Sequence, residues 1–95
     1  MGNASEVDYT ILILKAIAEY NRYRSPEAKA KLISFTDKTL VIEFSGSFCN
    51  TCNIQSYFED YIYELKRLTD CFTVEISQTK SLEMNKFEVK YEVLS

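Results

Sequence analysis

The sequence predicts a single α+β domain over residues 1–95, in the order α-β-β-α-β-β. Two helices would pack on one face of a four-stranded, mostly antiparallel sheet. Apolar residues recur at helical spacing in two segments and alternate with polar residues in the segments between and after them. Two Gly and one Pro leave little material for long loops, and 46% hydrophobic residues supply a core. Because the outer strand positions are polar, helices on one face are sufficient to cover the sheet.

The first helix is expected to begin near Ser5 and to end in the polar stretch 21–24. Its apolar residues at helical spacing, and those that flank them, are Val7, Ile11, Leu14 and Ala18, and Ile13, Ile17 and Tyr20. This apolar arc is too wide for a helix that lies on one surface only. We therefore expect the helix to contact both the sheet and a partner chain.

A hairpin is predicted next. Ser25, Pro26 and Glu27 form a helix-start signature, which predicts one short turn over residues 26–30. Residues 32–35 and 40–44 are predicted strands, because both are rich in large apolar residues. The polar residues 36–39 between them predict the hairpin turn.

The second helix has the clearest pattern. One apolar stripe of period 3.6 contains Ile54, Tyr57, Phe58, Tyr61, Ile62, Leu65 and Leu68. Lys66 and Arg67 fall in the last turn, where cations suit the helix dipole. Alternation then predicts strands over 72–76 and 87–93, joined by a polar connection.

Composition excludes several classes of function. The net charge is −3 and no basic cluster is longer than Lys66-Arg67, so we expect no nucleic-acid partner. No apolar run approaches the ~20 residues that span a bilayer, so no membrane association is expected. No signal-peptide pattern is present at the start, which favours a cytoplasmic location.

The complete absence of histidine excludes every Ser-His or Cys-His catalytic arrangement within one chain. It also removes a common metal ligand and the commonest general base. No acid–base role is assigned to Glu59 or Asp60, since the pattern places both on the exposed side of the second helix. A protein without catalytic turnover is therefore favoured.

The residues most capable of chemistry are Cys49 and Cys52, in a C-x-x-C at the predicted junction between a strand and a helix. This spacing can place two thiolates on one iron–sulfur cluster or on one metal ion such as zinc. The same pair could exchange disulfides, with Cys49 as the nucleophile and Cys52 as the resolving thiol. In a third interpretation the chain is an interaction module and the two cysteines are structural. Cys71 is expected to be a packing residue rather than a third ligand.

The stretch 41–52, which ends in this C-x-x-C, resembles the C-terminal domain of NifU-type iron–sulfur scaffold proteins. That family has a helix, a hairpin, a glycine followed by C-x-x-C, a helix and a strand, and the similarity extends over roughly residues 11–77. The resemblance implies that Cys49 and Cys52 bind an iron–sulfur cluster, usually shared between two subunits. It also implies a scaffold or carrier role.

Two surface expectations complete the analysis. A site with only two or three thiolates predicts a homodimer or a protein partner, because clusters and zinc take four ligands. Tyr63, together with Tyr20 and Tyr23, is expected to mark a partner surface. Arg22 and Arg24 are expected to be solvated.

Overall fold

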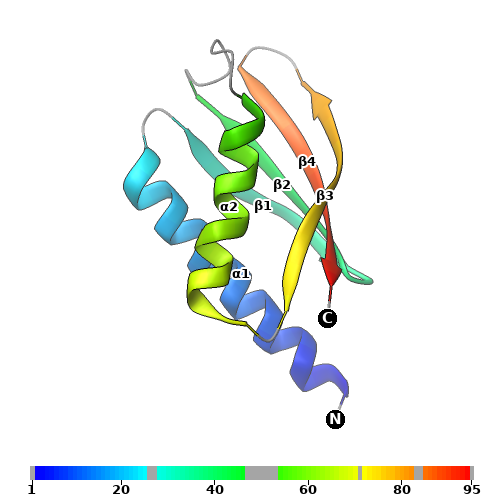
Figure 1. Cartoon of the computed structure of the whole chain (residues 1–95). Coiled ribbons are helices and arrows are strands. Elements are labelled where there is room, and N and C mark those ends of the chain that lie inside the picture. The colour runs from blue at the N-terminus through cyan, green and yellow to red at the C-terminus, as the bar shows by residue number, and fades with distance from the viewer. Residues whose placement is uncertain (1, 26–27, 47–53, 71, 83–84, 95) are drawn as a thin grey trace.

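The computed structural model describes residues 2–25, 28–46, 54–70, 72–82 and 85–94, with side chains described from residue 9 onward (Figure 1). The predicted order of two helices and four strands is confirmed. The elements are α1 (Gly2–Arg24), β1 (Lys29–Thr36), β2 (Thr39–Ser45), α2 (Ile54–Leu68), β3 (Thr73–Ser81) and β4 (Lys86–Leu94).

The four strands form one sheet in the order β1-β2-β4-β3, and every neighbouring pair is antiparallel. The last strand in sequence, β4, is therefore a central strand, and β1 and β3 are the edges. Directly opposed residues lie on the same face of a sheet. Ile42 of β2 opposes Leu32 of β1 and Val89 of β4, so these three side chains share one face.

That face carries the hydrophobic core, and both helices cover it (Figure 1). The ring of Phe44 in β2 lies 5.4 Å from Tyr20 of α1 and 5.2 Å from Phe58 of α2. Leu40, Ile42 and Phe44 are fully buried, while the β2 residues between them are only half-buried. The prediction of two helices on one face of the sheet is therefore confirmed.

Strand β1 begins earlier than expected, at Lys29, so the short turn predicted over residues 26–30 is wrong from Lys29 onward. A contact between distant residues explains the difference. The side chain of Asn21 in α1 donates a hydrogen bond to the carbonyl of Ala30 at 3.0 Å and accepts one from its N–H at 2.7 Å. The Asn21 side chain thus satisfies the backbone N–H and C=O of Ala30 as a neighbouring strand would. No local sequence pattern predicts this contact.

The other boundaries differ by less. α1 begins at Gly2 rather than near Ser5, and β3 continues to Ser81 through residues predicted as a connection. β3 contains a bulge between Ile76 and Gln78, which changes which residues face the core beyond that point. The simple alternation of the sequence therefore stops at the bulge although the strand does not.

Helix α1 buries the residues on one side of its apolar arc and leaves residues in the middle of the arc exposed. Ile13, Ile17 and Tyr20 are buried, whereas Ile11 and Leu14 are each 47% exposed. The wide arc thus leaves apolar surface uncovered on this chain, as a helix with two contact surfaces would. Within the described parts of the chain, no helix is long and apolar enough to cross a membrane.

Candidate functional site

All three cysteines lie outside the described residues. Cys49 and Cys52 belong to residues 47–53, which connect Gly46, just after β2, to Ile54 at the start of α2. The described residues on either side of this segment determine the charge and the rigidity of its surroundings.

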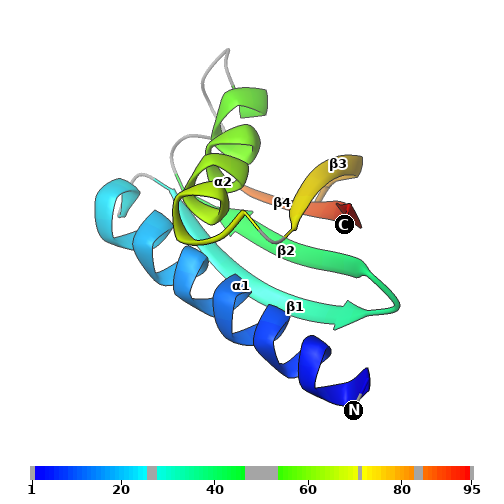
Figure 2. The ribbon, with the colours of Figure 1, turned by 60° about the horizontal axis from the view of Figure 1, so that its bottom comes forward.

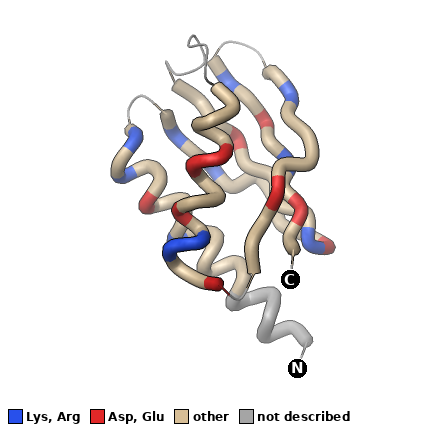
Figure 3. The backbone as a smooth tube through the Cα atoms, in the orientation of Figure 1, with Lys and Arg blue, Asp and Glu red and all other residues tan. Residues whose placement is uncertain are grey.

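Two lysines flank the end of β2. Ser45, the last residue of β2, opposes Lys29 of β1 on one side and Lys86 of β4 on the other. Both lysines are exposed, and Lys and Arg segments lie at this end of the sheet as well as at its other end and at the end of α2 (Figure 3). A nearby ammonium group lowers the pKa of a thiol and favours the thiolate. Strand register brings these charges together from positions far apart in the sequence.

The start of α2 adds further positive potential. The first turn of α2 carries the positive end of the helix dipole. No acidic residue occupies the first turn of α2, so no side chain of that turn neutralises the dipole. Lys29 and Lys86 lie on the face of the sheet that the helices leave uncovered, because the neighbouring row Ala30, Phe44 and Phe87 packs in the core, whereas α2 lies on the core side.

Gly46 fixes the direction in which the chain leaves β2. Its φ angle is 134°, in a region that side chains with a Cβ avoid. Its N–H donates a hydrogen bond to the carbonyl of Asn85, at the start of β4, at 3.2 Å. The exit of β2 is thus tied to the neighbouring strand.

We expect Gly46→Ala to lower the free energy of unfolding by about 1–3 kcal/mol, the usual cost of holding a non-glycine residue in such a conformation. Urea unfolding followed by circular dichroism measures the change. Ser45→Ala is the matched control, because β2 is extended there and a methyl group is tolerated. Equal stability of Gly46→Ala and the parent would show that the backbone at 46 has no such requirement.

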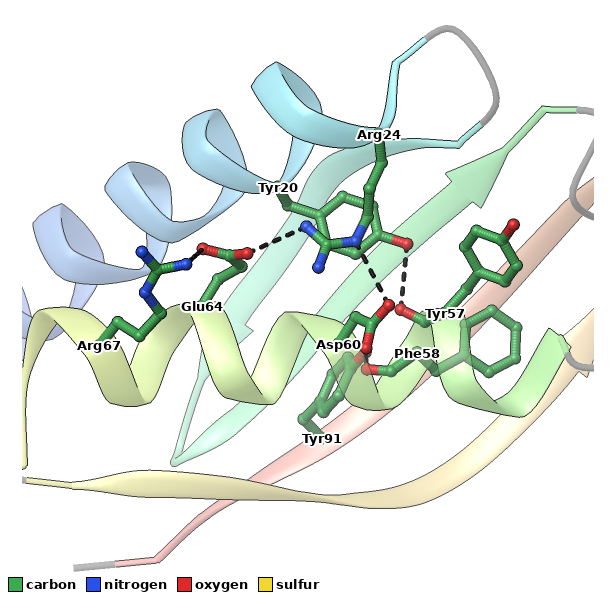
Figure 4. Close-up of polar contacts among 8 residues, drawn as sticks. All are labelled: Tyr20, Arg24, Tyr57, Phe58, Asp60, Glu64, Arg67 and Tyr91. Atoms are coloured by element: carbon green, nitrogen blue, oxygen red, sulfur yellow. Dashed lines mark hydrogen bonds and ion pairs between the residues drawn. The ribbon is translucent and has the colours of Figure 1, made fainter.

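Two buried tyrosines hold the N-terminal half of α2 in place (Figure 4). The hydroxyl of Tyr20 in α1 donates to the carbonyl of Tyr57 at 3.0 Å, and that of Tyr91 in β4 donates to the carbonyl of Phe58 at 2.8 Å. Burial raises the pKa of both phenols, so they remain neutral donors. The helix is therefore fixed to α1 and to the central strand shortly after the cysteine segment.

A charged cluster joins the C-terminal end of α1 to α2. Arg24 contacts Asp60 at 3.3 Å and Glu64 at 3.0 Å, and Arg67 approaches Glu64 at 3.7 Å (Figure 4). Burial acts to lower the pKa of Arg24, but the bonds with Glu64 and Asp60 outweigh it and the net pKa is raised. The expectation that Arg24 is solvated is wrong: its side chain is 21% exposed and lies over the ring of Tyr20.

Of the three tyrosines predicted to mark a partner surface, two are exposed. Tyr23 and Tyr63 are 59% and 63% exposed, whereas Tyr20 is fully buried. Tyr20 is excluded from any partner surface because its ring packs on Phe44 and its hydroxyl is bonded to α2. Sequence spacing alone did not distinguish these three residues.

Among the described residues, no group of three or more Cys, Asp or Glu side chains could hold a metal ion. Comparison of the chain with family models, with curated proteins and with solved structures found no match.

Proposed function

We propose that Cys49 and Cys52 form a thiolate site that binds an iron–sulfur cluster or a metal ion, in a scaffold or carrier role without turnover. The observation that supports this proposal most directly is the placement of Lys29 and Lys86 on both sides of Ser45. These lysines and the start of α2 flank the segment that contains both cysteines along the chain and through strand register, and positive potential there would favour thiolates. Thiolates and the clusters that they hold benefit from such potential.

The number of ligands determines what else the proposal requires. A cluster or a tetrahedral zinc ion takes four ligands, and the C-x-x-C supplies two. The described residues contain no group of three or more Cys, Asp or Glu side chains that could hold a metal ion. We therefore propose that a second copy of the chain supplies the other two thiolates, so that loading and dimer formation occur together.

The test is anaerobic incubation with iron and sulfide, followed by a visible spectrum and by size-exclusion chromatography. We expect absorbance near ~400 nm, the thiolate-to-iron charge-transfer region, together with a dimer. Cys49→Ser and Cys52→Ser should each abolish the colour, whereas Cys71→Ser should retain it. A parent protein that stays colourless and binds neither iron nor zinc would contradict the proposal.

The lysines provide a second arm of the same test. Lys29→Glu and Lys86→Glu should reduce the iron retained in the presence of a competing chelator. Lys15→Glu is the matched control, because it makes the same charge change on the exposed surface of α1. Equal iron retention in all three variants would remove the lysines from the argument.

Thiol–disulfide exchange is the second candidate, and the same two lysines favour it, because a lowered thiol pKa speeds attack on a disulfide. In this case Cys49 attacks and Cys52 resolves the mixed disulfide within one chain. A reversible Cys49–Cys52 bridge in a protein that binds no metal would select this candidate. If the serine variants change only stability, the cysteines are structural.

A further inference from the structure

A groove of about 550 Å³ lies between α2 and the edge strand β3. From α2 it is lined by Gln55, Glu59, Ile62, Tyr63 and Lys66, and from β3 by Val74, Glu75 and Ile76. Side chains of successive strand residues point to opposite faces of a sheet. Three consecutive residues can line one groove only if the groove runs along the edge of the strand.

The two edges of the sheet differ in how they are covered. At β1, the helix α1 runs alongside (Figure 2), and Asn21 satisfies both backbone groups of Ala30. β1 also carries Lys29 and Lys31, and lysines discourage the addition of another strand. β3 pairs with β4 on one side only, and its first four residues, 73–76, include neither lysine nor proline. The bulge after Ile76 separates this part of β3 from residues 78–81, which pair with β4 in a shifted register and include Lys80.

The face of the sheet that the helices do not cover, here called the open face, carries rows of charged side chains. These rows indicate where a basic side chain is missing beside β3. In one row across all four strands, Glu43 and Glu88 oppose each other, and Lys31 and Lys80 flank them at the two edges. This arrangement offsets a like-charge pair with a base on each side. The sheet thus contains one fully balanced row.

A second row on the same face contains two acidic residues and no basic residue. Glu92 of β4 opposes Glu75 of β3, and on its other side Glu92 accepts a hydrogen bond from the hydroxyl of Thr39 at 3.5 Å. Among the described residues, no ion pair involves Glu75, Glu92 or Glu59. Glu75 is exposed at the free edge, so the next position in this row lies outside the chain. A basic residue there would supply the charge that Lys80 supplies in the first row.

We propose that β3 binds an extended segment of a partner protein, which adds to residues 73–76 as a fifth strand. The segment has the pattern aliphatic–basic–aliphatic. Its basic side chain opposes Glu75 on the open face, and its aliphatic side chains enter the groove beside Ile62 and Tyr63. Backbone hydrogen bonds to the free edge supply affinity, and the charge and the groove supply specificity.

The test uses isotope-labelled full-length protein and two synthetic peptides, Thr-Thr-Val-Lys-Val-Thr-Thr and the same peptide with glutamate in place of lysine. We expect the lysine peptide to shift the amide NMR signals of residues 73–77 and of Tyr63 saturably. It should bind about fivefold more tightly than the glutamate peptide, the order expected for one cross-strand charge pair. Glu75→Lys should reverse this preference and Glu75→Gln should abolish it.

Glu19→Lys is the control, since it makes the same charge change on α1 and should leave the preference intact. Methylating the backbone nitrogens of alternate peptide residues separates strand addition from other modes of docking. Methylation of the residues whose N–H groups face β3 should abolish binding, and methylation of the residues whose N–H groups point away should preserve it. The proposal is overturned if neither peptide gives saturable shifts, or if both methylated sets bind equally. It is also overturned if the signals of 73–77 shift with protein concentration alone, which would assign this edge to a second copy.

Discussion

Above pH 10 the protein is expected to lose stability steeply, because three tyrosines are buried as neutral hydrogen-bond donors. Tyr20, Tyr61 and Tyr91 are fully buried, and their hydroxyls donate to the carbonyls of Tyr57, Ile13 and Phe58. Burial raises the pKa of all three phenols above the ordinary value of 10.0. The folded protein therefore retains protons that the unfolded chain releases.

The sign of the effect follows from this difference in bound protons. Below pH 10 both states hold the phenolic protons, so the stability from these groups is fully present. As pH rises above 10.0 the unfolded chain ionises first, and the free energy of unfolding falls. Three protons correspond to a slope of about 4 kcal/mol per pH unit, enough to unfold a small domain within a few units.

Urea unfolding at a series of pH values on both sides of 10 measures this slope. Tyr91→Phe should reduce it by about one third, since one of the three groups no longer titrates. It should also lower the stability at neutral pH by about 1 kcal/mol through loss of one hydrogen bond. Tyr63→Phe is the control, because Tyr63 is 63% exposed. An unfolding free energy that does not change above pH 10 would show that these phenols are not held neutral.

The second large effect is expected at the charged cluster between the helices. Arg24→Met removes the bonds to Asp60 and Glu64 and leaves Glu64, which is only 5% exposed, without its shortest contact. Breaking a buried ion pair from one side lowers the free energy of unfolding by about 3 kcal/mol, because a buried charge loses its partner. Thermal and urea unfolding near neutral pH measure the loss.

Two variants separate the buried pair from a general effect of charge. Arg67→Met should cost only about 0.5 kcal/mol, since Arg67 is 70% exposed and lies 3.7 Å from Glu64. The double variant Arg24→Met, Glu64→Met should recover most of the loss, because no buried charge remains. A double variant less stable than Arg24→Met would contradict this account.

The elements were predictable because each depends on a local pattern. Ile54 and Leu65 belong to one helical stripe, and Phe87 and Val93 belong to one alternating strand. Such periodicity states which side chains share a face of an element. It does not state which elements meet, so the partners of Arg24 and the burial of Tyr20 could not be predicted.

The candidate site was likewise predictable only in part from the sequence. The sequence identifies Cys49 and Cys52 as the residues capable of thiolate chemistry, but it shows no charge close to them along the chain. Lys29 and Lys86 come next to Ser45 through the register of three strands. Register depends on the packing of the entire core face, so these lysines could not be assigned to the site beforehand.

The order β1-β2-β4-β3 has a consequence for synthesis on the ribosome. A nascent chain that has emerged as far as β3 can already pair β1 with β2 and form both helices. However, β3 has no strand to pair with, because its only neighbour is β4, which is translated later. When β4 emerges, it pairs with β2 and gives β3 a neighbour, and it brings Val89 and Tyr91 to complete the core. Folding of this sheet is therefore completed only after β4 has emerged, rather than progressively from α1 onward.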